Sequence, residues 1–151
     1  MRSVPELNER TDELIGRALA EDLGTGDITT DAIVSPDIRS TACLYSKAKG
    51  ILAGIEIFAR VFYHTDPDLD VKIYCRDGEE IGKNDIVAAI TGSAASILKA
   101  ERTALNFLGR MSGIATRTRQ FVDLAGEYGV KILDTRKTAP GMRHLDKYAV
   151  R

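Results

Sequence analysis

The chain has 151 residues, of which 44% are hydrophobic and 28% are charged. This composition is that of an ordinary globular protein and excludes a disordered, collagenous or coiled-coil chain. No apolar run approaches the roughly 18 to 20 residues that a membrane-spanning helix needs, and the first ten residues carry no apolar stretch of a signal peptide. The sequence therefore predicts a soluble, cytoplasmic protein without a membrane partner.

The net charge of −1 conceals two halves of opposite sign. Residues 1–98 hold 10 Lys and Arg against 17 Asp and Glu, a balance of −7, whereas residues 99–151 hold 11 against 5, a balance of +6. A basic half on a nearly neutral chain indicates an anionic ligand, which could be a nucleic acid, a phosphate or a carboxylate.

Cysteines and histidines give no sign of a disulfide framework or a metal site. Cys43 and Cys75 each lie inside a strand-like run, so we expect two buried, reduced thiols. His64 and His144 are isolated from further ligands at metal spacing, which favours structural or surface histidines over zinc ligands.

The first predicted helix begins at a capping box formed by Ser3 and Glu6 around Pro5. Its apolar face comprises Leu7, Thr11, Leu14, Ile15, Ala18 and Leu19. We expect it to stop at Gly24. The loop from Gly24 to Asp27 favours a helix-ending turn over a phosphate-binding loop, because no strand precedes its glycines.

A small sheet with helices packed on it is predicted up to about residue 92. Strands are expected over 41–48, 69–75 and 86–90, where apolar residues alternate or form short runs. A short amphipathic helix falls between the first two strands, with apolar positions Ile55, Phe58, Ala59 and Phe62. Asp77-Gly78 predicts a hairpin turn between the second and third strands.

A long helical pattern follows over residues 96–125. Its predicted apolar side comprises Leu98, Leu105, Leu108, Ala115, Val122 and Ala125. Gly109 and the Ser112-Gly113 pair interrupt the pattern, and they predict a kink or a break in the helix.

The last predicted elements are a buried strand over 130–135, a turn at Pro140-Gly141 and a helix from residue 143 to the end. A helix followed by a buried strand with charged residues at its carboxyl end is typical of the start of an α/β barrel or a doubly wound sheet. Active sites lie at that end of such strands.

Cations are densest between residues 134 and 151. Arg136 and Lys137 follow the predicted strand directly, where a guanidinium fork and an ammonium group could bind a carboxylate or phosphate in one pocket. Arg102 is a second candidate, because it must point away from the predicted apolar side of its helix. The alternatives are a solvated basic turn and a surface arginine paired with Glu101 or Asn106. Nucleic-acid binding is disfavoured, since the basic stretch 110–119 lacks interleaved aromatic residues and any nucleic-acid-binding signature.

The segment from Asp134 to Arg143, DTRKTAPGMR, continued by Lys147 to Val150, KYAV, closely resembles the signature of the quinolinate phosphoribosyltransferases. Three further segments resemble the family in order and spacing: EDLGTGDITT over 21–30, the Gly-rich stretch 48–62, and 100–107 through 112–116. The resemblance covers essentially the whole chain.

This resemblance implies an enzyme of NAD biosynthesis that joins quinolinate to 5-phosphoribosyl 1-diphosphate with Mg²⁺, giving nicotinate mononucleotide, diphosphate and CO₂. It implies a homodimer in which Arg102 reaches the neighbouring site, while Thr135, Arg136 and Lys137 line the quinolinate pocket. Arg143 and Lys147 are additional anion-binding candidates. No protein ligands for the Mg²⁺ and no certain catalytic residue are identified in this chain.

The implied fold is α+β, with an N-terminal α/β sandwich over 1–95, an interdomain helix over 96–128 and the start of an incomplete α/β barrel over 129–151. Only one barrel strand is present, so we expect this polypeptide alone to be inactive and its strand edges to favour self-association. Two alternatives stay open: a nicotinate-type phosphoribosyltransferase or paralogue with an altered substrate, and a non-catalytic dimerisation or ligand-binding module.

Overall fold

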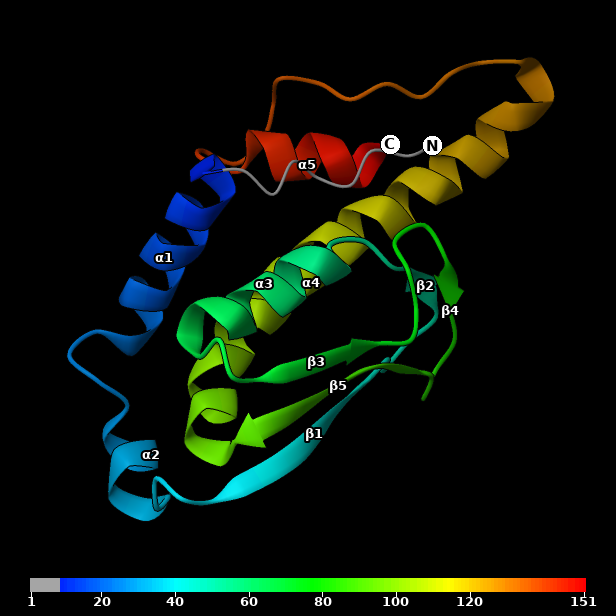
Figure 1. Ribbon diagram of the computed structural model, residues 1–151. Helices are drawn as coiled ribbons and strands as arrows, with labels where there is room; N and C mark the ends of the chain where they lie inside the picture. Colours follow the sequence, from blue (N-terminus) through cyan, green and yellow to red (C-terminus); the bar gives the residue numbers. More distant parts are fainter. Residues whose placement is uncertain (1–8) are drawn as a thin grey trace.

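The computed structural model describes residues 9–151 and packs a small antiparallel sheet against helices, one of them long (Figure 1). The helices are α1 (Glu9–Leu23), α2 (Ile28–Ile33), α3 (Ile55–Thr65), α4 (Ala94–Ala125) and α5 (Arg143–Val150), with a 3-10 turn η1 (Gly126–Tyr128) after α4. The strands are β1 (Arg39–Tyr45), β2 (Gly50–Ile51), β3 (Asp70–Ile73), β4 (Glu80–Ile81) and β5 (Ile86–Ser93). This architecture confirms the predicted α+β class. The expected capping box of Ser3 and Glu6 lies outside the described residues.

The main sheet has the strand order β1-β5-β3 with antiparallel pairing throughout. Strand β5 is central, so its apolar residues are covered, and Ile90 lies between Ala42 of β1 and Val71 of β3. The predicted turn at Asp77-Gly78 is present, but it leads into β4, which pairs with β2. The second and third predicted strands correspond to β3 and β5, which do pair with each other. The chain between them passes through the turn and β4, so they do not form a simple hairpin.

Strand β1 forms an exposed edge of the sheet. Cys43 on this strand is exposed and Cys75 is partly buried, so the prediction of two buried thiols is wrong for Cys43. The run around Cys43 does alternate, but Cys43 lies with Thr41 and Tyr45 on the face of the antiparallel sheet that is turned to solvent. Burial raises the pKa of the Cys75 thiol, with Glu79 and Asp85 adding to the effect.

The N-terminus of α3 is held by a carboxylate from a distant turn. The Asp77 carboxylate accepts hydrogen bonds from the backbone N–H groups of Gly54 at 2.8 Å and Ile55 at 3.0 Å. It also accepts one from the Tyr148 hydroxyl of α5 at 2.8 Å. A negative charge at this position satisfies free N–H groups and suits the helix dipole. Asp77 thus connects α3 with the C-terminal helix.

Helix α4 is one continuous helix of 32 residues, so the predicted break at its glycines is wrong. Its polar side chains bond to a neighbouring backbone segment instead of disrupting the helix. Ser112 Oγ accepts from Ala53 N at 3.1 Å and donates to Ala53 O at 3.2 Å, and Thr116 Oγ1 accepts from Ile51 N at 2.8 Å. Packing along the helix offsets the cost of two interior glycines, about 1 kcal/mol each.

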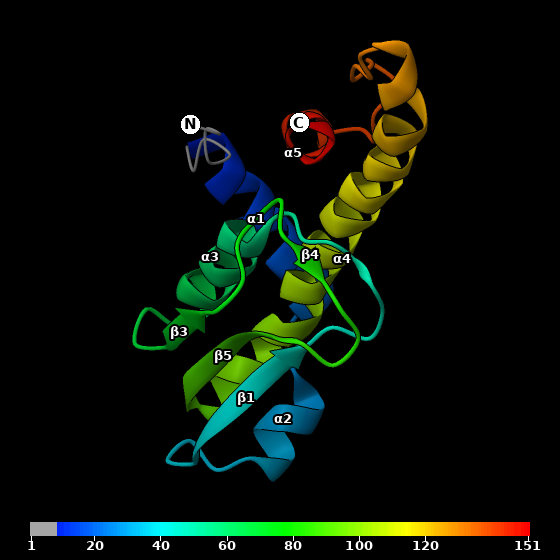
Figure 2. The ribbon, with the colours of Figure 1, turned by 90° about the vertical axis from the view of Figure 1, so that its right-hand side faces the viewer.

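The buried face of α4 differs from the predicted one. Leu108 and Ala115 are buried as expected, but Leu98, Leu105 and Val122 are exposed. The face that joins the core instead comprises Ile97, Ala100, Thr103, Ala104, Phe107, Leu108, Met111 and Ala115. Small residues at 100 and 104 allow close packing of neighbouring elements, which the leucine pattern did not indicate. Figure 2 shows the sheet and α2 around one end of α4, with α5 beside its other half.

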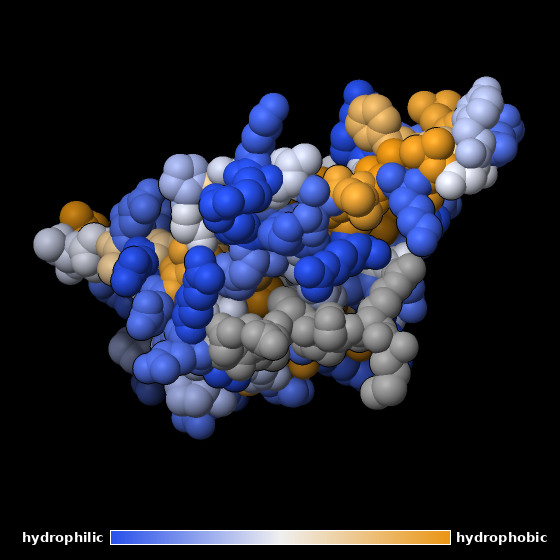
Figure 3. All heavy atoms as spheres, turned by 90° about the horizontal axis from the view of Figure 1, so that it is seen from above, coloured by the Kyte–Doolittle hydropathy of each residue, from blue (hydrophilic) through white to orange (hydrophobic). Residues whose placement is uncertain are grey.

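Residues 130–135, the predicted buried strand, are irregular in the structure. Val130 and Leu133 are exposed, because no strand among residues 9–151 pairs with this segment. Parallel strands become regular only when neighbours satisfy their backbone groups. Hydrophobic side chains gather over the end of α4 (Figure 3). The exposed ones there are Phe121, Val122, Leu124, Tyr128, Val130 and Leu133.

Candidate functional site

Asp146 is the anchor of the basic C-terminal segment. Its two carboxylate oxygens accept from Nε and Nη2 of Arg110 on α4, both at 2.8 Å, and Oδ2 also accepts from Ala139 N at 3.1 Å. The residue is only 6% exposed. The hydrogen bond from Arg110 holds the pKa of Asp146 below its ordinary value, against the opposite effect of burial. This pair fixes the turn at 138–141 and the start of α5 on α4.

Three of the predicted site residues stand together before that turn. Thr135, Arg136 and Lys137 are all exposed, and Lys137 N donates to Thr135 Oγ1 at 3.1 Å. Neither Arg136 nor Lys137 has an ion-pair partner within residues 9–151. Two adjacent cations are therefore available to an anion at the carboxyl end of the 130–135 segment, where the sequence predicts them.

Arg143 and Lys147 project from α5 into a different region. Arg143 Nε donates to Thr138 Oγ1 at 3.2 Å, and Lys147 forms an ion pair with Asp134. Both line a pocket of about 460 Å³ that none of residues 135–137 lines. The structure thus brings these two additional candidates together at one pocket, and their side chains contact Asp134 and Thr138, the residues on either side of 135–137.

Arg102 lies on α4 with 74% of its side chain exposed. Its Nη1 donates to Asp22 Oδ1 of α1 at 3.0 Å, and this hydrogen bond raises the pKa of the guanidinium. The partner is neither Glu101 nor Asn106, the two residues that the sequence suggested. Arg102 lines a second pocket, of about 490 Å³, together with Asp27, Thr29, Thr30, Leu98, Glu101, Leu105 and Asn106.

The loop from Gly24 to Asp27 ends one helix and begins the next. Gly24 has a φ of 53° and donates its N–H to Ala20 O at 3.0 Å. The Asp27 carboxylate caps α2: it accepts from the Thr30 hydroxyl at 2.5 Å and from Thr30 N at 3.0 Å. These hydrogen bonds, that of the hydroxyl first, hold the pKa of Asp27 below its ordinary value. The predicted helix-ending turn is therefore confirmed.

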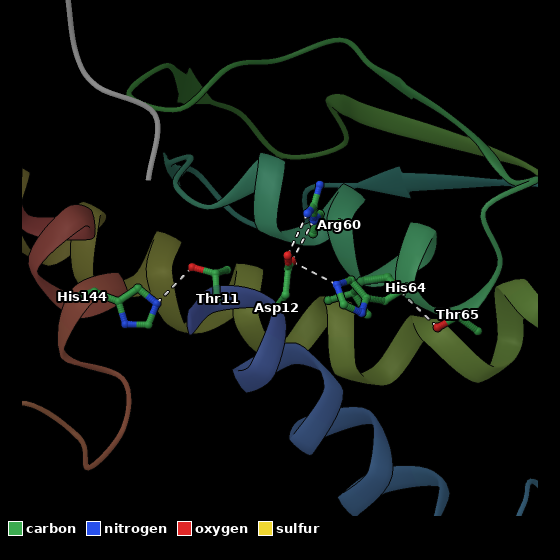
Figure 4. Close-up of polar contacts among 7 residues, drawn as sticks. Thr11, Asp12, Arg60, His64, Thr65 and His144 are labelled. Carbon is green, nitrogen blue, oxygen red and sulfur yellow. Dashed lines mark hydrogen bonds and ion pairs between the residues drawn. The ribbon is translucent and has the colours of Figure 1, made fainter. Parts of the chain in front are cut away.

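Both histidines contact α1, at consecutive residues (Figure 4). His64 Nε2 lies 3.0 Å from Asp12 Oδ1, and Arg60 donates two hydrogen bonds, at 2.9 and 2.8 Å, to the same carboxylate. His144 Nε2 lies 3.3 Å from Thr11 Oγ1. Burial lowers the pKa of His144, and nearby Arg10 lowers it further. Both histidine side chains thus connect their own helices to α1.

The Asp12 contacts predict a loss of stability in acid. Hydrogen bonds from Arg60 and then His64 lower the pKa of Asp12 from 3.8 to about 2. The folded state thus favours the carboxylate, and its stabilisation is present above pH 3.8 and is lost as the pH falls toward 2. Because Asp12 is partly exposed, we expect its contribution to the free energy of unfolding near neutral pH to be about 1 to 2 kcal/mol.

Urea unfolding of the chain and of Asp12→Asn measures this contribution. The two proteins should differ near pH 6 and converge toward pH 2.5. A difference that stays constant over this range would contradict the assignment to Asp12.

Metal-ligating side chains do not converge in the described part of the chain. No group of three or more His, Cys, Asp or Glu residues within 9–151 could hold a metal ion. No helix over the same range is long and apolar enough to cross a bilayer.

Several residues that shape the site were not predicted from the sequence. They are Asp22, Asp77, Arg110 and Asp146, each of which pairs with a group from another element. Asp146 had one available signal: it is one of only two acidic residues between 134 and 151. An isolated carboxylate among cations, on the inward face of a helix, is a candidate for a buried pair.

Comparison with known families identifies the chain. The N-terminal domain of quinolinate phosphoribosyl transferase matches residues 27–112, and the C-terminal domain of the same family matches residues 114–151. The chain belongs to the quinolinate phosphoribosyl transferase family.

Individual relatives agree with this assignment. The decarboxylating quinolinate phosphoribosyltransferase 2b of Nicotiana tabacum, named as mitochondrial, is 44% identical over 91% of this chain and 39% of its own length. A probable carboxylating nicotinate-nucleotide pyrophosphorylase of Bacillus subtilis is 40% identical over 92% of this chain and 48% of its own. The crystal structure of NadC from Streptococcus pyogenes superposes with a TM-score of 0.91 at 38% identity, covering 93% of this chain and 50% of that one.

The chain thus spans between two fifths and half of the length of these relatives. It matches the N-terminal half of the NadC structures, with a short piece of the C-terminal domain. The predicted family and fold class are confirmed by these matches.

Proposed function

We propose that this chain is part of an enzyme that transfers a phosphoribosyl group from 5-phosphoribosyl 1-diphosphate to quinolinate and releases diphosphate and CO₂. Family membership supports the reaction class. The observation that carries the substrate assignment is the pair of adjacent, unpaired cations, Arg136 and Lys137, at the end of the 130–135 segment. A pyridine dicarboxylate needs such a concentration of positive charge.

The residues of this chain act by binding and positioning. The Arg136 guanidinium can bind one carboxylate through two parallel hydrogen bonds, and the Lys137 ammonium adds a point charge beside it. The hydrogen bond between Lys137 N and Thr135 Oγ1 fixes their local backbone. Holding the dicarboxylate in place lets the ring nitrogen meet the ribosyl carbon as diphosphate departs. The quaternary ring nitrogen then stabilises the electron pair left when CO₂ departs.

Mg²⁺ is proposed to arrive with the diphosphate group of the donor. Divalent magnesium commonly binds through substrate phosphates and few protein ligands. Since the described residues form no metal-ligand cluster, we assign no protein ligand to the metal and no step to it.

A homodimer is proposed in which Arg102 serves the site of the neighbouring subunit. Arg102 is exposed on α4 between the exposed Leu98 and Leu105, and its pocket contains none of residues 135–137. Exposed leucines beside an exposed guanidinium group suit a surface covered by a second copy. In such a dimer, Arg102 of one subunit would lie beside Arg136 and Lys137 of the other subunit, where quinolinate is proposed to bind.

We further propose the domain division 1–95, 96–128 and 129–151, with α4 as the connection between the sandwich and the barrel. A cytoplasmic location is also our proposal. The printed names of the plant relatives place them in mitochondria or chloroplasts, so fractionation of the source cell would test this point.

The 151-residue polypeptide alone is expected to show no measurable phosphoribosyl transfer. The matched residues make up 39% and 48% of the length of two of its relatives, and a barrel of about 200 to 250 residues cannot be formed by residues 129–151. A coupled assay of diphosphate release, on a sample whose mass has been verified, measures this. Sustained turnover would show that the polypeptide needs no further residues.

Quinolinate binding is tested by calorimetric titration of the chain at low and then moderate salt. We expect quinolinate to bind more tightly than nicotinate, because the second carboxylate adds a charge-assisted contact. Arg136→Ala should weaken quinolinate binding by at least about tenfold, which corresponds to 1.4 kcal/mol. Added salt should weaken it in the wild type as well.

Arg119→Ala is the matched control, since Arg119 is an exposed arginine of α4 that lines neither pocket. It should bind quinolinate like the wild type. Equal binding of quinolinate and nicotinate would favour a nicotinate-type enzyme. Equal affinities of the Arg136 and Arg119 variants would remove the assignment to Arg136.

A further inference from the structure

A cation-lined pocket lies between the start of α1 and the start of α5. It has a volume of about 460 Å³ and is lined by Arg10 from α1, by Arg143, His144 and Lys147 from α5, and by the turn 138–141. Pockets for small ligands commonly have volumes of about 300 to 1,000 Å³. The pocket therefore has room for a small molecule and is not a packing gap.

Positive charge dominates the lining of this pocket. Three of its described side chains carry positive charge, and no Asp or Glu among residues 9–151 lines it. Lys147 is paired with Asp134, whereas Arg10 and Arg143 have no ion-pair partner within residues 9–151. Arg10 is close enough to His144 to lower the pKa of its imidazole. The guanidinium groups of Arg10 and Arg143 are thus the two lining charges that a bound anion could neutralise.

Uncompensated backbone donors lie at the same place. Helix α5 has no side-chain cap, and within residues 9–151 the N–H groups of Arg143 and His144 have no hydrogen-bond acceptor. His144 Nδ1 is buried and also lacks a partner in that range. Free N–H groups at the start of a helix add to the attraction that the side-chain cations exert on an anion.

We propose that this pocket is a second anion site and that it binds a phosphate-class oxyanion, with diphosphate preferred over monophosphate. A tetrahedral oxyanion can accept from cations and N–H groups that converge from several directions, whereas a planar carboxylate suits a single guanidinium fork. The pocket is larger than one phosphate group needs. It contains none of Arg102, Thr135, Arg136 and Lys137, so it goes beyond the proposed quinolinate site.

The test is a titration of the 151-residue chain with inorganic diphosphate, inorganic phosphate and quinolinate at low salt. Saturable binding of diphosphate is expected, tighter than that of phosphate. Arg10→Gln and Arg143→Gln should each weaken it by about fivefold, the change that 1 kcal/mol produces. Arg119→Gln and Arg136→Ala should leave it unchanged. Circular dichroism checks that each variant is folded.

Amide NMR adds a readout that does not depend on the variants. Diphosphate should shift the resonances of Arg143 and His144 in the wild-type chain. The proposal is overturned if diphosphate does not bind, if Arg10→Gln and Arg143→Gln both bind it like the wild type, or if its binding is lost in Arg136→Ala. Loss of quinolinate binding alone in Arg136→Ala leaves the second site standing and separates it from the proposed substrate site.

Discussion

Gly54→Ala should destabilise the fold by about 3 kcal/mol, because it combines a strained backbone with a core clash. Gly54 has a φ of 94°, which a residue with a Cβ atom rarely adopts. An added Cβ would lie 2.6 Å from Met111 Sδ and 3.2 Å from Met111 Cβ. Met111 is fully buried on α4 and cannot move aside freely. Urea unfolding of the variant measures the loss.

Gly113→Ala is the matched control on α4. Nothing lies within 4 Å of its added Cβ, and residue 113 is inside a regular helix. Alanine is therefore expected to stabilise the fold, by up to about 1 kcal/mol. If the two variants changed stability in the same direction and by similar amounts, the close approach of α3 to α4 at Gly54 would be wrong.

Local sequence patterns predicted the helices whose bounds and buried faces depend mainly on their own residues. Helix α1 ends at Leu23 just before the predicted Gly24, and α3 buries Ile55, Phe58 and Phe62 as expected. Helix α5 covers 143–150. In these helices the apolar period and the ending glycine agree with the final packing, so short-range information decides the result.

Local sequence patterns did not predict the structure where contacts with residues far away in the chain determine it. Gly109 and Gly113 weaken α4 locally, yet contacts of Ser112 with Ala53 and the buried Met111 keep it continuous. The 130–135 segment shows the opposite case. Its apolar residues favour a strand, but a strand also needs a neighbour to satisfy its backbone groups. The spacing of apolar residues along the chain indicates neither the distant contacts that keep α4 continuous nor the presence or absence of a neighbouring strand.

The candidate site divides in the same way. Thr135, Arg136 and Lys137 were proposed as site residues from the sequence, and the structure leaves all three exposed after the irregular 130–135 segment. Their distance from the Arg143 pocket was not readable. It depends on the Asp146–Arg110 pair, whose members are 36 residues apart. Charge counts identify a basic segment, but only tertiary contacts show which of its cations line the pocket beside α5.

Asp146→Ala should destabilise the fold by about 3 kcal/mol, because it removes one partner of a buried ion pair. Arg110 would lose both hydrogen bonds, and Ala139 N would lose its acceptor. The Arg110 side chain is 39% exposed and can be partly solvated, which keeps the loss at the lower end of the range for such pairs. Urea unfolding at neutral pH is the measurement.

Asp31→Ala provides the control, because its ion pair with Lys99 is at the surface, with 53% of the Asp31 side chain exposed. Exposed pairs contribute less than about 1 kcal/mol, so this variant should remain close to the wild type. The double variant Asp146→Ala with Arg110→Ala should lose less than the sum of the two single variants, since each single change removes the same pair. Strict additivity would mean that Asp146 stabilises α5 without Arg110. The anchoring of the turn at 138–141 would then rest on the Ala139 hydrogen bond alone.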